Sequence, residues 1–171
     1  MKHSVLRILA LSFALLILSV TFAACGGDND TGLVFKSGDT EIAIGAKADP
    51  IVQSLGAPDS KSESPSCGFP GTDYLYLYQS KGLRISTTPD ESGASVVCKI
   101  ELMSDLVSTP EGLKIGMSAD AAKTAMNGTD ASLEAAGENL IYTAGNMRLR
   151  VNCVGGSVTA ITYISLDKDN A

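Results

Sequence analysis

The sequence predicts an α+β protein of two tandem repeats, each a helix packed on antiparallel strands, forming one larger sheet with the helices on one face. Two observations predict this class. Apolar segments with two-residue alternation, separated by short turn motifs, predict strands, and two short amphipathic segments predict helices. The element Ile44-Gly45-Ala46-Lys47-Ala48-Asp49 also returns, before the second helix, as Ile115-Gly116-Met117-Ser118-Ala119-Asp120.

The first repeat is predicted over residues 33–105. Its helix, residues 46–55, ends at Gly56-Ala57-Pro58, because glycine suits a left-handed cap and proline cannot continue a helix. A long polar loop is expected over Asp59–Asp73. The strands expected in this repeat are a hairpin over 33–35 and 41–44, and three strands over 74–79, 83–88 and 95–103.

The second repeat is predicted over residues 106–166, with shorter loops. Ser118 is a good N-cap for a helix over 119–126, which Asn127-Gly128 ends. A polar loop is expected up to Glu138. The expected strands are 140–144, 147–153 and 157–166, followed by a tail over 167–171.

The first 24 residues have the layout of a secretory signal peptide. Lys2 and Arg7 precede an apolar stretch over 8–20, which is too short to span a membrane comfortably. The stretch is followed by Phe22-Ala23-Ala24-Cys25, which resembles the lipobox of bacterial lipoproteins. This resemblance implies cleavage before Cys25 and a diacylglycerol on its sulfur, and residues 25–32 then form a flexible polar tether.

Composition excludes several classes of function. The chain has a formal charge of −6, and the signal peptide contains two basic residues, so the processed chain carries −8 and repels nucleic acid. The single histidine, His3, lies in the signal peptide, which removes histidine-based catalysis and histidine-ligated metals. We expect no catalytic residue, no metal and no cofactor beyond the lipid on Cys25.

Three cysteines remain for the folded region, Cys67, Cys98 and Cys153. A disulfide is plausible outside the cytoplasm, and three pairs are possible. Cys67–Cys98 is the favoured pair because both cysteines belong to the first repeat. Free or buried thiols are the alternative.

The order of elements resembles the tandem fold of secreted beta-lactamase inhibitor proteins and the single-unit SmpA/OmlA lipoproteins. This resemblance covers about Ile42 to Ile164 and depends on Ile-Gly-x-x-x-Asp before a helix and on Leu55-Gly56-Ala57-Pro58 after it. The chain also resembles uncharacterised lipoproteins of Gram-positive bacteria, through Cys67-Gly68-Phe69-Pro70-Gly71 and Thr109–Gly116. These resemblances imply a fold and a family, and no activity.

Candidate binding residues are three tyrosines and two arginines. Tyr74, Tyr76 and Tyr78 alternate along one strand and face the same side, either as a partner-binding row or as core under the helices. Arg84 and Arg148 occupy matching places on two hairpins and could pair with a partner's carboxylates, or could simply point outward into solvent.

The sequence therefore predicts a lipid-anchored, extracytoplasmic, non-catalytic module of the bacterial cell envelope. It is expected at the cell membrane, held there by its lipid alone, and it binds another envelope or secreted protein through an open sheet face. Two alternatives remain. An inhibitor of a secreted hydrolase, such as a beta-lactamase or protease, would need a loop that enters an active site, and Asp59–Asp73 is the candidate. A small-ligand or cell-wall-binding lipoprotein would need a closed apolar pocket.

Overall fold

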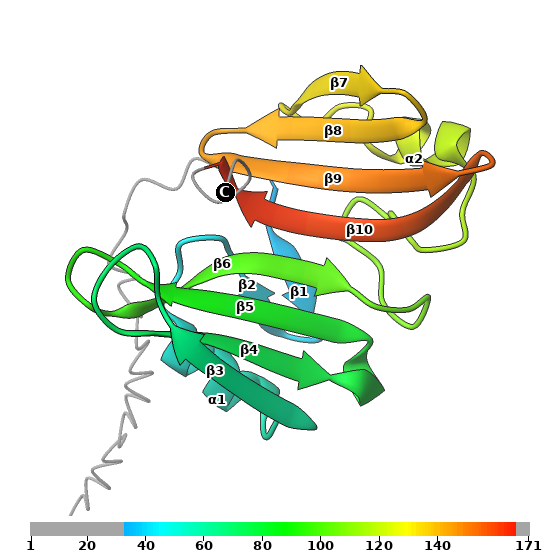
Figure 1. The fold of residues 1–171 in the computed structure, drawn as a ribbon. Coiled ribbons are helices and arrows are strands. Elements are labelled where there is room, and N and C mark those ends of the chain that lie inside the picture. The colour runs from blue at the N-terminus through cyan, green and yellow to red at the C-terminus, as the bar shows by residue number, and fades with distance from the viewer. Residues whose placement is uncertain (1–32, 167–171) are drawn as a thin grey trace, which may run out of the picture.

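One eight-stranded antiparallel sheet forms most of the fold. The computed structural model describes residues 33–166, and Figure 1 shows the sheet face-on. Two four-stranded meanders meet at its centre, where β6 pairs with β10 from Lys99–Ile164 to Leu102–Ile161. From edge to edge the strands are β3 (Ser60–Pro65), β4 (Thr72–Tyr78), β5 (Leu83–Pro89), β6 (Ser95–Leu102), β10 (Ser157–Ser165), β9 (Met147–Val154), β8 (Asn139–Ala144) and β7 (Ser132–Ala136).

The smaller elements cover one side of this sheet. A two-stranded hairpin and two short α-helices lie behind the sheet in Figure 1, and a single 3-10 turn, η1 (Gln79–Lys81), links β4 to β5. Apolar side chains of both helices join the strand residues in one continuous core. The covering elements are β1 (Phe35–Ser37), β2 (Thr40–Ile42), α1 (Ala48–Leu55) and α2 (Ala119–Ala125).

The predicted α+β class is wrong, because the described part of the chain is mostly β. α1 has eight residues and α2 has seven, about two turns each, whereas strands extend across both halves. The architecture is a single broad sheet with a small hairpin, rather than two helix-on-strand repeats. The sequence analysis placed both helices within a few residues of their positions in the structure. The error was in the class, because these helices make up only a small part of the described chain.

Both outer strands were missed as polar loops. β3 lies inside the expected loop Asp59–Asp73, and β7 lies inside the expected loop before Glu138. Every residue of both strands is exposed, so neither strand has the apolar alternation that identifies a half-buried strand. Residues 66–71 alone remain between β3 and β4, so most of the segment expected to enter an active site is bonded into the sheet edge.

Two glycines attach the segments before the helices to the sheet. Gly45 donates its backbone N–H to the Val97 carbonyl at 2.7 Å, and Gly116 donates to the Val158 carbonyl at 2.8 Å. Both have positive φ, 83° and 89°, a conformation that glycine adopts without steric cost. These bonds bring α1 and α2 onto the same side of the sheet, which leaves the opposite side free of helices in the described residues.

The core contains a fully buried tyrosine, Tyr163, on β10. Its ring centroid lies 5.9 Å from that of Phe35, and its hydroxyl is buried near the side chain of Thr109 without a well-formed hydrogen bond. Burial raises the pKa of Tyr163 above its ordinary value of 10.0, with a further increase from the negative charge of Glu111. The folded chain therefore keeps this proton above pH 10, where the unfolded chain loses it.

We predict that Tyr163→Phe raises the free energy of unfolding at neutral pH by up to about 1 kcal/mol, because it removes a buried hydroxyl that makes no well-formed hydrogen bond. Deprotonation of Tyr163 in the unfolded chain does not affect stability below pH 10, and it favours unfolding as the pH rises above 10. The phenylalanine variant lacks this titration, so it should also unfold at a higher alkaline pH. Urea titrations monitored by circular dichroism between neutral and alkaline pH measure both effects. An unchanged alkaline midpoint would contradict the assignment.

Candidate functional site

The candidate site is the side of the sheet that faces away from the helices, here called the open face. Strand register aligns its side chains in two rows that cross all eight strands. The first row is Ser62, Leu75, Ser86, Lys99, Ile164, Arg148, Thr143 and Ser132. The second row is Ser60, Leu77, Arg84, Glu101, Thr162, Arg150, Ile141 and Glu134.

The tyrosine row is part of the core and does not belong to the open face. Tyr76 and Tyr78 are 7% and 1% exposed, and Tyr74 packs against the same core at its edge. Burial raises the pKa of Tyr76, as do the nearby Tyr74 and Asp49. Tyr76 and Tyr78 belong to the same core cluster as Ile51 and Leu55 of α1. The partner surface expected at these tyrosines is therefore corrected, and the core alternative describes their placement.

The opposite row of the same strand reaches the open face instead. Leu75 and Leu77 alternate with the tyrosines and are half-buried on the helix-free side. Sequence reasoning missed them because both rows of β4 are apolar, so alternation alone does not say which row faces the core. The partner strand β3 gives no signal either, because the residues that pair with the leucines and those that pair with Tyr74 and Tyr76 are equally polar.

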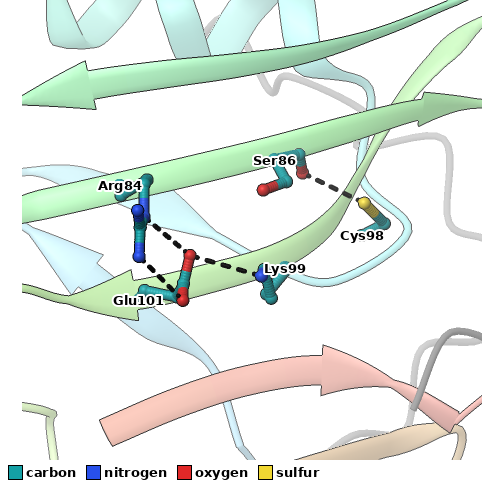
Figure 2. A network of polar contacts seen from close by, with 5 residues as sticks. All are labelled: Arg84, Ser86, Cys98, Lys99 and Glu101. Carbon is teal, nitrogen blue, oxygen red and sulfur yellow. Dashed lines mark hydrogen bonds and ion pairs between the residues drawn. The ribbon is translucent and has the colours of Figure 1, made fainter. Parts of the chain in front are cut away.

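Arg84 lies on the open face, where it forms an ion pair within the protein. Its Nε donates to Glu101 Oε2 at 2.8 Å and its Nη2 to Glu101 Oε1 at 3.1 Å, a two-pronged contact between β5 and β6. Lys99 Nζ lies 3.4 Å from the same Glu101 Oε2, as Figure 2 shows. One carboxylate thus holds two cations, and the side chains of Arg84 and Lys99 remain about one-third exposed.

Arg148 and Arg150 lie on β9, in the first and second rows respectively. Both are half-buried, as are the row residues beside them on β10, Ile164 and Thr162. Register therefore brings Arg84 and Arg148, the two arginines singled out from the sequence, onto one face, three strands apart. It also adds Arg150 and Lys99, which the sequence analysis did not select.

A groove of about 460 Å³ lies on the open face near β3 and the bulge of β6. Its lining is mixed, with apolar Leu75 and Ile164 beside polar Ser86 and Lys99. The acidic residues Glu63 and Asp73 also line it. The groove is open to solvent, unlike the closed apolar pocket expected of a small-ligand carrier.

The three cysteines lie on different segments of the chain, in the loop after β3, on β6 and on β9. Cys67, in the exposed loop after β3, is a free thiol, so the favoured Cys67–Cys98 bridge is not formed. Cys98 lies on β6, which is separated from β4 by β5, and it occupies a bulge where Ser86 pairs with Lys99 and Thr87 with Val97. Its Sγ donates to the Ser86 carbonyl at 3.4 Å (Figure 2). Cys153 is buried in the core, and burial raises the pKa of its thiol.

The described residues contain no group of three or more histidine, cysteine or acidic side chains placed to hold a metal ion. Among residues 33–166, no helix is long and apolar enough to cross a membrane. Cys25 and its tether, like the tail from residue 167, lie outside the described residues. The open face thus carries three arginines, a lysine and half-buried apolar carbon, residue types that are common in protein interfaces.

The sequence matches no protein-family model, and no curated protein matches it. Two solved structures are similar to parts of this chain. A cysteine-rich secretory protein from Staphylococcus aureus has 10% identity and a TM-score of 0.46, over 72% of this chain and 45% of that chain. An extracellular protein with an SCP domain from Bacillus anthracis has 11% identity and a TM-score of 0.48, over 76% and 47%.

The chain thus spans just under half the length of either solved protein. Their descriptions name them as secretory or extracellular. The resemblance to beta-lactamase inhibitor proteins and to SmpA/OmlA lipoproteins stays a prediction.

We predict that Glu101→Gln lowers the free energy of unfolding by about 1–2 kcal/mol, because it removes the carboxylate that Arg84 and Lys99 share. A double-mutant cycle with Arg84→Met, measured by urea unfolding, should give a coupling energy of at least about 0.5 kcal/mol. The matched control is Lys36→Gln, which breaks an exposed ion pair with Glu41 and should cost less than about 0.5 kcal/mol. Equal effects at both pairs would contradict the assignment.

Proposed function

We propose that this protein is a lipid-anchored, extracytoplasmic, non-catalytic module that binds another envelope or secreted protein through its open face. The observation that carries the proposal is the composition of that face. Half-buried Leu75, Leu77, Ile141 and Ile164 alternate there with arginines, on a side of the sheet that no described helix covers. Protein interfaces are enriched in arginine and bury apolar carbon beside it.

The dimensions of the open face suit a protein partner. Eight strands at the usual spacing are about 34 Å wide, and a typical interface buries about 800 Å² on each partner. Antiparallel pairing across the whole sheet makes this surface rigid. The module would therefore lose little conformational entropy when a partner binds. A surface of this size suits a folded protein better than a small molecule.

The sequence around Cys25 supports the lipid anchor and the location. A lipid on Cys25, followed by the small polar tether 26–32, would hold the described domain close to the membrane surface. The acidic processed chain would be repelled by anionic headgroups, so the lipid alone would provide the attachment.

We predict that Cys25→Ala blocks lipidation and shifts the protein out of the detergent phase when host membranes are partitioned in Triton X-114. Mass spectrometry of the native N-terminal peptide should show a diacylglycerol on the Cys25 sulfur. Cys67→Ala is the matched control, since it removes an exposed cysteine of the folded domain and should leave partitioning unchanged. An unmodified Cys25 in the mature native protein would overturn the anchor.

We predict that the lipid-free mature protein captures a defined partner from crosslinked host envelope, and that Leu75→Ser with Ile164→Ser reduces the capture at least about tenfold. Both side chains lie on the open face. The matched control is Leu106→Ser with Leu133→Ser, which removes two exposed leucines outside the two rows, Leu133 being opposite the buried Tyr142 in the strand register. Thermal unfolding checks that each variant folds. Equal loss in both double variants, or no specific capture, would contradict the proposal.

A further inference from the structure

We propose that the outer edge of β7 pairs with β7 of a second copy of this chain, forming an antiparallel dimer centred on Leu133. This inference goes beyond the proposed function, because it concerns an edge of the sheet and not the open face. Among residues 33–166, no strand pairs with β7 on the side away from β8. An edge of this kind presents backbone N–H and C=O groups that another strand can meet.

The two edge strands of the sheet differ in the row that faces the helices. In β3 this row holds Lys61 and Glu63, opposite two tyrosines of β4. In β7 it holds Leu133 and Ala135, opposite two buried side chains of β8. Charges and proline on an edge strand discourage pairing with another chain, and β3 also ends at Pro65. β7 has neither lysine nor proline, so it lacks these protections.

Lys61 protects the first edge, and the second edge has no equivalent. The Nζ atom of Lys61 lies 3.9 Å from the centroid of the Tyr74 ring and 5.6 Å from that of Tyr76. A strand added beside β3 would have to desolvate this ammonium group. At the other edge Leu133 is 50% exposed, so a strand added beside β7 would bury apolar carbon instead.

The turn between β7 and β8 determines which backbone groups of β7 point outward. Two residues, 137–138, connect the strands, so the flanking pair Ala136 and Asn139 is hydrogen-bonded. Hydrogen-bonded and non-hydrogen-bonded pairs alternate along an antiparallel ladder. The N–H and C=O groups of Leu133 and Ala135 therefore point away from β8, toward an incoming strand.

Self-pairing about Leu133 fits both the apolar pattern and the charge of this edge. A two-fold axis perpendicular to the sheet places Leu133 opposite Leu133 of the second copy, and Ala131 opposite Ala135. Ala131 already packs against the core, so the apolar row continues across the contact. Glu134 lies opposite Ser132 in this register, whereas an axis at position 134 would set two glutamates against each other.

This pattern favours a second copy over an unrelated strand. A two-fold dimer requires an edge that is complementary to itself, and the apolar row of β7 has this property in the register about Leu133. The five residues of β7 bury less area than a standard interface of about 1,600 Å². We therefore expect a weak dimer, with a Kd on the order of ten micromolar.

The test is sedimentation equilibrium of the processed chain carrying Cys25→Ser, from about 5 to 500 μM. A reductant prevents the exposed Cys67 from forming an intermolecular disulfide. The parent chain should dimerise, and Leu133→Lys should weaken the dimer at least about tenfold, because it gives β7 the kind of charge that protects β3. Ser132→Lys should tighten the dimer about threefold, because it sets an ammonium group opposite each Glu134.

Leu106→Lys is the matched control for both variants. It adds the same charge at an exposed leucine in the loop after β6, and it should change the Kd of the dimer less than about twofold. Circular dichroism confirms that each variant folds. An unchanged Kd in Leu133→Lys would overturn the contact at β7, and an unchanged or weaker dimer in Ser132→Lys would overturn the register.

A parent chain that stays monomeric at every concentration would overturn self-pairing. Crosslinking of a different protein by a benzophenone amino acid at position 133 would assign the edge to that protein instead. Dimerisation and partner capture are separable. Leu106→Ser with Leu133→Ser should lose the dimer and keep the captured partner, whereas Leu75→Ser with Ile164→Ser should do the reverse.

Discussion

The two-residue pleat of the eight-stranded sheet is the constraint on which the rest of the structure depends. Each strand gives alternate side chains to opposite faces, and the helices and hairpin bury one of those faces. Once Ile85, Ile100 and Leu149 are in the core, the neighbouring Arg84, Glu101 and Arg148 must lie on the other side. A shift of one residue in any strand would exchange these sets, so core packing itself positions the candidate site.

The sequence predicted most of the local structure of the central strands and both helices. Turn glycines, proline after α1 and the Ser118 cap, whose hydroxyl accepts from the Ala121 N–H at 3.2 Å, define those elements by local chemistry. The predicted fold class was wrong because both edge strands were taken for loops. These strands depend on pairing with a neighbouring strand and not on a pattern in their own residues. Ser60–Pro65 is polar on both sides, and nothing in its own residues distinguishes it from a loop.

The candidate site was predictable only in part, for the same reason. Arg84 and Arg148 were selected as outward residues, and the structure places both on the open face. The tyrosines were assigned to a possible binding surface, although Tyr78 is buried, because an apolar strand does not indicate which row is inside. The pairing of Lys99 with Ile164 joins the two halves of the sheet, and no pattern along the chain predicts such a long-range contact.

The open face is proposed to combine two properties that usually serve different purposes. Half-buried leucine and isoleucine provide area for contact, beside arginines, a residue type that is common in protein interfaces. The ion pair of Arg84 with Glu101 also links β5 to β6 when no other protein is bound. This sharing would let one face contribute to stability in the isolated protein and to recognition in a complex.

Site-specific photocrosslinking in intact cells tests the central claim most directly. A benzophenone amino acid would replace Thr162, at the centre of the open face between Glu101 and Arg150, or Leu106, which is 72% exposed outside the two rows. The account predicts that the probe at position 162 crosslinks to one protein partner and that the probe at position 106 does not. Crosslinking of a partner from position 106 alone would contradict it.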